Sequence, residues 1–212
     1  MRRLLLPLTV AGAALGACSS DRLTGPAVGT TVAPRPAAEI RTVGVIGDSI
    51  TVGAEPDLRA ALEVLGLQVA RVDAESGRRM AVDAAVGSGV EAAGRVAAVD
   101  PDLWVVALGT NDVANLDGVE AYANAIDTLL DAVPDDAPLV WVDVYVDTAE
   151  EASATFNRVL RDRLGQRGGA TVVDWASVAD DDGVLYDGVH PGEDGNLVFA
   201  DRTADGVATW LG

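Results

Sequence analysis

The sequence has one cysteine, one histidine and no lysine, and each scarcity excludes a class of protein. One cysteine cannot form an internal disulfide, and together with one histidine it cannot supply the Cys/His cluster of a structural zinc site. Acidic residues number 33 against 15 basic residues, all arginine, for a formal net charge of -18. A nucleic-acid-binding protein needs a basic face for the phosphates, which this composition does not supply. We therefore predict no metal, no other cofactor and no nucleic-acid partner.

The chain does have enough apolar content for a sizeable core. Hydrophobic residues make up 49% of its 212 residues and charged residues only 23%, which is too apolar for a disordered chain. The length corresponds to one domain of ordinary size with a short extension.

The N-terminus has the pattern of an export signal. Arg2 and Arg3 precede an apolar run that is too short to span a bilayer, so residues 1–17 are predicted to be a signal peptide. The run ends in Leu-Gly-Ala-Cys18, which resembles the lipobox of bacterial lipoproteins, where the cysteine is diacylated and becomes the new N-terminus. We predict lipidation at Cys18. The alternative is an ordinary secretory signal cleaved near Ala17, which leaves Cys18 as a free thiol.

The segment after Cys18 has the composition of a tether. It is rich in Gly, Thr, Ala and Pro and has no apolar period, so residues 18–40 are predicted to hold a domain at residues 41–212 away from a membrane. The acidic surface would be repelled by anionic headgroups, so attachment is expected to depend on the acyl chains. The predicted location is the extracytoplasmic side of the cell envelope.

Short apolar runs alternate with longer segments of helical period in the domain, which is typical of a parallel sheet covered on both faces. The predicted strands are residues 42–47, 68–72, 103–108, 139–145 and 171–175. The predicted helices are residues 53–65, 89–99, 118–132, 148–164 and 192–211. Ligands of such sheets bind beyond the carboxyl ends of the strands, so the chemistry is expected there.

Three polar segments follow predicted strands. The first strand runs into Gly-Asp-Ser49-Ile, the third into Gly-Thr-Asn111-Asp, and the last strand precedes Asp187-Gly-Val-His190-Pro. Each segment alone also fits an ordinary turn or helix cap. A serine nucleophile needs a base for its proton, and a histidine base needs a carboxylate to fix its tautomer. His190 is the only histidine, and Asp187 is the candidate carboxylate beside it.

Together these segments resemble the SGNH hydrolase family, the GDSL-type esterases and lipases, which is named for a Ser, Gly, Asn and His on separate blocks. The matching residues are Ser49, Gly77, Asn111 and His190, in the family's order. Ile50 stands where the name-giving motif has Leu. The resemblance implies a flavodoxin-like three-layer α/β/α sandwich with a five-stranded parallel sheet. The alternative Gly-x-Ser-x-Gly elbow of α/β-hydrolases is absent around Ser49.

The resemblance also implies a role for each residue. Ser49 attacks the ester carbonyl, His190 moves the proton and Asp187 orients the imidazole. The oxyanion hole consists of the backbone N–H groups of Ser49 and Gly77 and the side-chain amide of Asn111. Because the base must be neutral, activity is expected to rise with pH as the imidazole loses its proton.

The remaining polar residues are expected to have structural or surface roles. Arg78 and Arg79 are expected to be solvated surface residues, with a contact to an anionic or sugar group of the substrate as the alternative. Asp48 and Asp112 are expected to hydrogen-bond the loops of their neighbours. The run Asp180-Asp181-Asp182 is expected to be a solvated turn, because the spaced oxygen ligands of a calcium loop are absent. Tryptophans at 104, 141 and 210 are expected in the core.

The sequence thus predicts a monomeric serine ester hydrolase that acts on a small-molecule, lipid or glycan acyl ester. Two alternatives remain. A cell-envelope O-acyltransferase would use the same acyl-enzyme with a sugar hydroxyl in place of water, and a sugar-binding module would retain the fold without catalysis.

Overall fold

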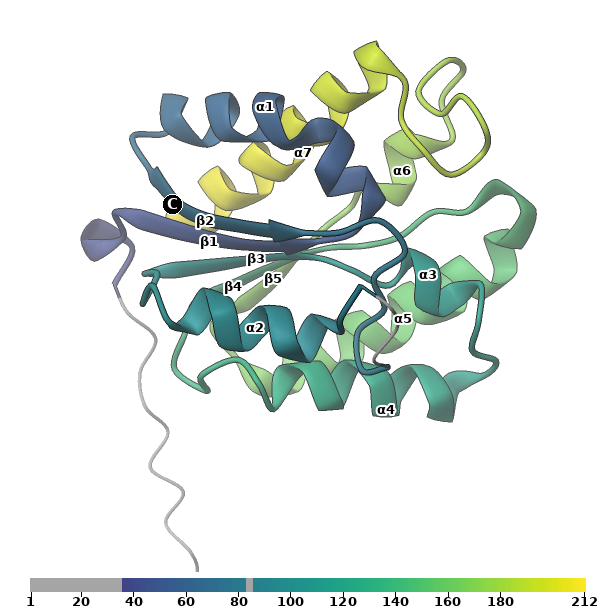
Figure 1. Ribbon diagram of the computed structural model, residues 1–212, viewed down its shortest axis with the longest axis horizontal. Coiled ribbons are helices and arrows are strands. Elements are labelled where there is room, and N and C mark those ends of the chain that lie inside the picture. Colours follow the sequence, from purple (N-terminus) through teal and green to yellow (C-terminus); the bar gives the residue numbers. More distant parts are fainter. Residues whose placement is uncertain (1–35, 83–85) are drawn as a thin grey trace, which may run out of the picture. The chain divides into compact units, whose positions relative to one another are not determined.

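A computed structural model of the chain describes residues 36–82 and 86–212 (Figure 1). The predicted signal peptide, Cys18 and most of the predicted tether lie outside these residues. The last residues of the predicted tether are part of the fold, because a 3-10 turn, η1 (Ala37–Glu39), leads into Ile40, which is 3% exposed in the core.

The sheet has five parallel strands in the order β2-β1-β3-β4-β5. These are β1 (Thr42–Gly47), β2 (Gln68–Ala74), β3 (Leu103–Ala107), β4 (Leu139–Val142) and β5 (Ala170–Val173). Strand order reverses between β1 and β3, so the loops after these two strands diverge and leave room for a site between them.

Helices cover both faces of the sheet. One face carries α1 (Ser49–Val64), α6 (Ala176–Ala179) and α7 (Glu193–Leu211) (Figure 1). The other face carries α2 (Gly89–Ala97), α3 (Thr110–Val113), α4 (Val119–Leu130) and α5 (Glu150–Arg167), the last preceded by the 3-10 turn η2 (Asp147–Ala149). The predicted three-layer α/β/α sandwich is confirmed.

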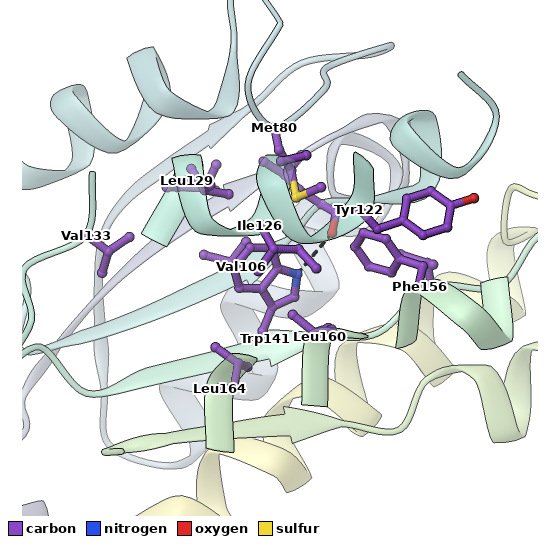
Figure 2. Close-up of a cluster of buried hydrophobic side chains, with 14 of the residues drawn as sticks. Met80, Val106, Tyr122, Ile126, Leu129, Val133, Trp141, Phe156, Leu160 and Leu164 are labelled. Carbon is purple, nitrogen blue, oxygen red and sulfur yellow. Dashed lines mark hydrogen bonds between the residues drawn. The ribbon is translucent and has the colours of Figure 1, made fainter. Parts of the chain in front are cut away.

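The core has two layers because successive strand residues point to opposite faces. Val105 packs in the layer under α1 and α7, whereas Trp104 and Val106 pack in the layer under α2, α4 and α5. Figure 2 shows the second layer, where the Trp141 indole donates a hydrogen bond to Leu108 O at 3.0 Å. Trp104 and Trp141 are buried as predicted, but Trp210 is only half-buried at the edge of the first layer.

Several element boundaries differ from the prediction for reasons of tertiary contact. Helix α1 begins at Ser49 rather than at residue 53, because the Asp48 carboxylate caps it. Strand β4 ends at Val142 rather than at residue 145, since the Asn157 side chain binds both the N–H and the C=O of Val144 in place of a neighbouring strand. Strand β5 ends at Val173 because the chain turns there into α6.

Candidate active site

Ser49 lies at the carboxyl end of β1, as the first residue of α1. The Asp48 side chain accepts the N–H of Ile50 at 3.0 Å, and the Asp48 carbonyl accepts the N–H of Val52 at 3.0 Å. In the described part of the chain, no acceptor faces the N–H of Ser49 itself. This free donor at the positive end of a helix dipole can bind negative charge that develops beside the Ser49 hydroxyl.

The glycines that precede Ser49 and Asn111 are required by packing. A Cβ at Gly47 would lie 2.0 Å from the Thr51 hydroxyl, so any side chain there would displace the first turn of α1. Gly109 has φ of 133°, and a Cβ there would lie 2.5 Å from the Phe156 ring. Both glycines therefore serve to hold the following polar residue close to the sheet.

His190 lies in a tight loop that the fold brings to Ser49. The loop is closed by an isolated antiparallel bridge between Leu185 and Pro191, and Tyr186 N–H donates to His190 O at 3.0 Å. The structure places Ser49 Oγ 3.0 Å from His190 Nε2, although the two residues are 141 positions apart. The hydroxyl and the imidazole are in direct hydrogen-bond contact.

Asp187 lies on the other side of the imidazole. Its Oδ2 is 2.9 Å from His190 Nδ1, and its Oδ1 accepts the backbone N–H groups of Val189 at 3.0 Å and His190 at 2.7 Å. The backbone N–H of His190, together with the His190 imidazole, lowers the pKa of Asp187. Because an ionised carboxylate only accepts, Nδ1 carries the proton and Nε2 is left to accept the Ser49 hydroxyl.

The other predicted hole residues, Gly77 and Asn111, lie in loops that are bonded to one another. Gly77 has φ of 78°, the left-handed conformation that favours glycine, and its N–H has no acceptor among the described residues. The Asn111 amide donates to Arg78 O at 3.1 Å and, more weakly, to Asp48 Oδ2 at 3.4 Å. To donate to a reaction intermediate, the Asn111 amide must give up one of these bonds, and the longer one to Asp48 is the weaker.

Two buried carboxyls support the loops around Ser49, as expected. Burial raises the pKa of Asp48 to about 7, partly offset by the hydrogen bond from the Ile50 N–H. Burial also raises the pKa of Asp112 to about 6, although Asp112 accepts the N–H of Met80 at 3.1 Å. Asp48 and Asp112 hold the loops of Ser49 and Gly77 through hydrogen bonds rather than through surface charge.

The raised pKa of Asp48 predicts that stability falls as the pH rises. The carboxyl keeps its proton to about pH 7 in the folded protein but loses it near the ordinary value of 3.8 in the unfolded chain. Its contribution is therefore complete below the ordinary value and lost by about pH 7, and it amounts to about 4 kcal/mol in the free energy of unfolding. Asp48→Asn should flatten this dependence in urea unfolding between pH 4.5 and 7.5.

The matched control for this experiment is Asp201→Asn, which changes an exposed carboxylate on α7. It should leave the slope of the wild-type protein in place, because its carboxylate remains in water. An unchanged slope in Asp48→Asn would show that this carboxyl is ionised in the folded protein at pH 4.5.

The side chains that bond to one another at Ser49, His190 and Asp187 are open to solvent. The His190 side chain is 36% exposed and that of Asp187 41%. Tyr186, which the sequence analysis did not single out, is 71% exposed, and its ring stacks on the imidazole with centroids 6.1 Å apart. A cavity of about 620 Å³ lies between α5 and α6 and is lined by residues such as Tyr145 and Arg161. Ser49, Asp187 and His190 do not line this cavity.

Arg78 corrects one expectation of the sequence analysis. It is 2% exposed rather than solvated, and it pairs with Asp73. The Arg79 side chain is 18% exposed, with Nε 3.7 Å from an Asp112 oxygen. The burial of Arg78 is hard to identify from sequence, because its guanidinium bonds the ends of two strands, at Asp73 of β2 and at Gly47 of β1, 31 positions away.

The acidic run after α6 does not form a metal site in the described part of the chain. Asp180, Asp181 and Asp182 are exposed, as expected for a solvated turn, and Tyr145 donates its hydroxyl to Asp180 at 2.5 Å. Within residues 36–82 and 86–212, no group of three or more His, Cys, Asp or Glu side chains is arranged to hold a metal ion. In the same residues no helix combines the length and the apolar character needed to cross a membrane.

Comparison with solved structures gives several similar folds. The C-terminal catalytic domain of Streptococcus pneumoniae peptidoglycan O-acetyltransferase A is 23% identical, with a TM-score of 0.57, over 81% of this chain and 93% of that one. The psychrotrophic esterase EstA from Pseudoalteromonas sp. is 15% identical, with a TM-score of 0.57, over 81% and 98%. A member of the lipolytic protein G-D-S-L family from Veillonella parvula is 15% identical, with a TM-score of 0.60, over 78% and 97%.

A search of curated protein sequences found no match. The family model described as GDSL-like Lipase/Acylhydrolase family, however, matches residues 45–198, a range that includes Ser49, Gly77, Asn111 and the Asp187–His190 loop. The predicted family resemblance is thereby confirmed. The chain belongs to the GDSL-like lipase/acylhydrolase family.

Proposed function

We propose that the protein is a serine ester hydrolase that removes acyl groups from small-molecule, lipid or carbohydrate esters outside the cytoplasm. The observation that carries the proposal is the continuous contact from Ser49 Oγ to His190 Nε2 at 3.0 Å and from His190 Nδ1 to Asp187 Oδ2 at 2.9 Å. A hydroxyl, a neutral imidazole and an ionised carboxylate in this order are what nucleophilic acyl transfer requires.

The reaction proceeds in two halves. Ser49 Oγ bonds to the ester carbonyl carbon while its proton passes to His190 Nε2, and the tetrahedral intermediate collapses when His190 returns the proton to the leaving alcohol. A water then gives a proton to His190 and attacks the acyl-serine. His190 donates this proton to Ser49 Oγ as the second intermediate collapses, which releases the carboxylic acid and restores the Ser49 hydroxyl. Asp187 stabilises the imidazolium that exists in each intermediate.

The negative oxygen of each intermediate would be bound by the N–H groups of Ser49 and Gly77 and by the Asn111 amide. Support comes from the free N–H of Ser49 at the start of α1 and from the free N–H of Gly77. Donors that are already fixed by the fold stabilise developing charge without reorganisation at the moment of reaction.

The exposure of the triad favours substrates whose alcohol portion is large. Because His190 and Asp187 are open to solvent, a sugar polymer can approach the serine without entering a deep pocket. An acidic surface, with a chain charge of -18, disfavours strongly anionic polymers. We therefore propose short acyl esters of neutral glycans as the preferred substrates.

A second candidate function is O-acyl transfer to a sugar hydroxyl. It is favoured by the same exposure, which lets an acceptor hydroxyl take the place of water, and by the fold shared with the catalytic domain of a peptidoglycan O-acetyltransferase. A third expectation, lipid anchoring through Cys18 on the extracytoplasmic side, remains part of the proposal.

Product analysis distinguishes the two reactions. The protein would be incubated with nitrophenyl acetate, with and without an isotopically labelled chito-oligosaccharide, and acetate and acetylated sugar would be quantified. The proposed hydrolase releases acetate at the same rate with and without the sugar. If the labelled sugar becomes acetylated and less free acetate is released, the protein is an acyltransferase and not a hydrolase.

A further inference from the structure

Arg78 is one of the largest fully buried side chains of the domain, at 2% exposure. Burying a guanidinium is costly unless it is paired and hydrogen-bonded, so the contacts that hold it are informative. Its Nη2 lies 3.0 Å from Asp73 Oδ1, and its Nη1 donates to the carbonyl oxygens of Gly47, at 3.1 Å, and of Asp73. The guanidinium therefore joins the carboxyl ends of β1 and β2, and the first of these ends leads directly to Ser49.

The backbone of Arg78 makes the remaining connections. Its carbonyl accepts the Asn111 amide at 3.1 Å, and its N–H donates to Glu75 O at 3.2 Å, which closes the turn that contains Gly77. Every residue of the proposed oxyanion hole is thus linked to Arg78 by a short path. Ser49 is linked through Gly47, Gly77 is its chain neighbour, and Asn111 bonds to it directly.

We infer that Arg78 is the positioning residue of the oxyanion hole, fixing the relative places of the Ser49, Gly77 and Asn111 donors. This inference rests on the proposed function. Arg78 touches no reacting atom, and its effect is on where the donors lie when the negative oxygen forms. Displacement of a catalytic group by about 1 Å can cost about 100-fold in rate, so even a small relaxation of this link should be measurable.

A role of Arg78 that is limited to neutralising the Asp73 carboxylate can be distinguished from this positioning role. Arg95 binds both oxygens of the same carboxylate, at 2.8 and 2.9 Å, and Arg71 binds it at 3.1 Å. The Arg95 guanidinium, followed by that of Arg71, lowers the pKa of Asp73 to about 2. Asp73 therefore keeps two cationic partners when Arg78 is removed, whereas Gly47 O loses its side-chain donor.

The test compares Arg78→Gln with the wild-type protein, using nitrophenyl acetate as substrate. End-point titration with a fluorophosphonate counts the competent Ser49 groups, so that misfolded protein does not lower the measured kcat. We expect kcat per titrated site to fall between about 10- and 100-fold with little change in KM, as for a group displaced from its productive position. The affinity for a phenylboronic acid, which forms a tetrahedral anion on the serine, should fall by a similar factor.

Three further variants make the result specific. Arg95→Gln removes a ligand of the same carboxylate from the exposed side, and its kcat and boronic acid affinity should stay at wild-type values. Asn111→Ala, which removes one donor, should lose about 100- to 1,000-fold in kcat and sets the scale for a damaged hole. Arg78→Lys retains the charge beside Asp73 and should restore part of the loss, and it also serves if Arg78→Gln does not fold.

The outcomes separate the inference from the function on which it rests. Wild-type kcat per titrated site in Arg78→Gln or Arg78→Lys, or an equal loss in Arg95→Gln, would overturn the positioning role while the hydrolase remains. If the wild-type protein neither reacts with the fluorophosphonate nor cleaves the ester, the proposed function falls and the role of Arg78 falls with it.

Discussion

Ser49→Ala should reduce kcat for ester hydrolysis by at least about 10,000-fold, because Ser49 is the one hydroxyl that bonds the imidazole in the described part of the chain and the loss of one triad member disables the whole unit. The same variant should lose all fluorophosphonate labelling. The structural cost should be small, since the Ser49 side chain is only partly buried and its hydroxyl bonds to His190. Circular dichroism and thermal unfolding of the variant would establish that the fold is retained.

The matched control is Ser177→Ala, which changes an exposed serine on α6 whose partners lie outside the catalytic loops. It should keep both activity and labelling. A wild-type protein that resists the reagent would favour the non-catalytic sugar-binding module over the hydrolase. Labelling that persists in Ser49→Ala would show that another residue is the nucleophile.

Asp187→Asn should have the second large effect, a fall in kcat of about 10,000-fold with the fold intact. An asparagine oxygen can still accept the N–H groups of Val189 and His190, so the loop should keep its shape. The amide nitrogen would then face Nδ1 of His190 as a donor. The imidazole would carry its proton on Nε2, where it cannot accept the proton of Ser49.

The control for this variant is Asp182→Asn, a neighbouring exposed carboxylate of the acidic turn, which should retain wild-type kcat. Steady-state kinetics across pH 5 to 9 would show whether the loss in Asp187→Asn persists at every pH, as a wrong tautomer requires. Near wild-type turnover of Asp187→Asn would mean that the imidazole is oriented by the loop backbone alone.

The parallel sheet could be predicted because buried parallel strands leave a strong apolar signal. The family could be predicted from the resemblance of the blocks around Ser49, Gly77, Asn111 and His190. Once the strands were placed, Ser49 and Asn111 had to follow the carboxyl ends of β1 and β3, which lie side by side. The Gly and Pro neighbours of His190 indicate that it lies in a loop between the last strand and the last helix. These features depend on local pattern and on the rules of α/β topology.

The parts that could not be predicted depend on contacts between distant segments. Helix α1 starts at Ser49 although Thr51, Val52 and Gly53 are poor helix formers, because the Asp48 cap and packing against α7 outweigh their propensities. The burial of Arg78 follows from the meeting of two strand ends, which has no signature in the residues around it. The contact distance between Ser49 and His190 likewise exists only in the assembled fold.

In the proposed mechanism the four-residue span from Asp187 to His190 supplies both the proton acceptor and the carboxylate that orients it, and that carboxylate also bonds the backbone of its own loop. The span is tied to the rest of the domain at Gly188, whose carbonyl accepts the N–H of Asp147 at 2.9 Å. The proposed catalytic residues thus belong to two separate segments: Ser49 to the start of α1, and Asp187 and His190 to one short loop. A displacement of this loop as a whole would therefore change the distance between the Ser49 hydroxyl and the imidazole, whereas Asp187 and His190 would move together.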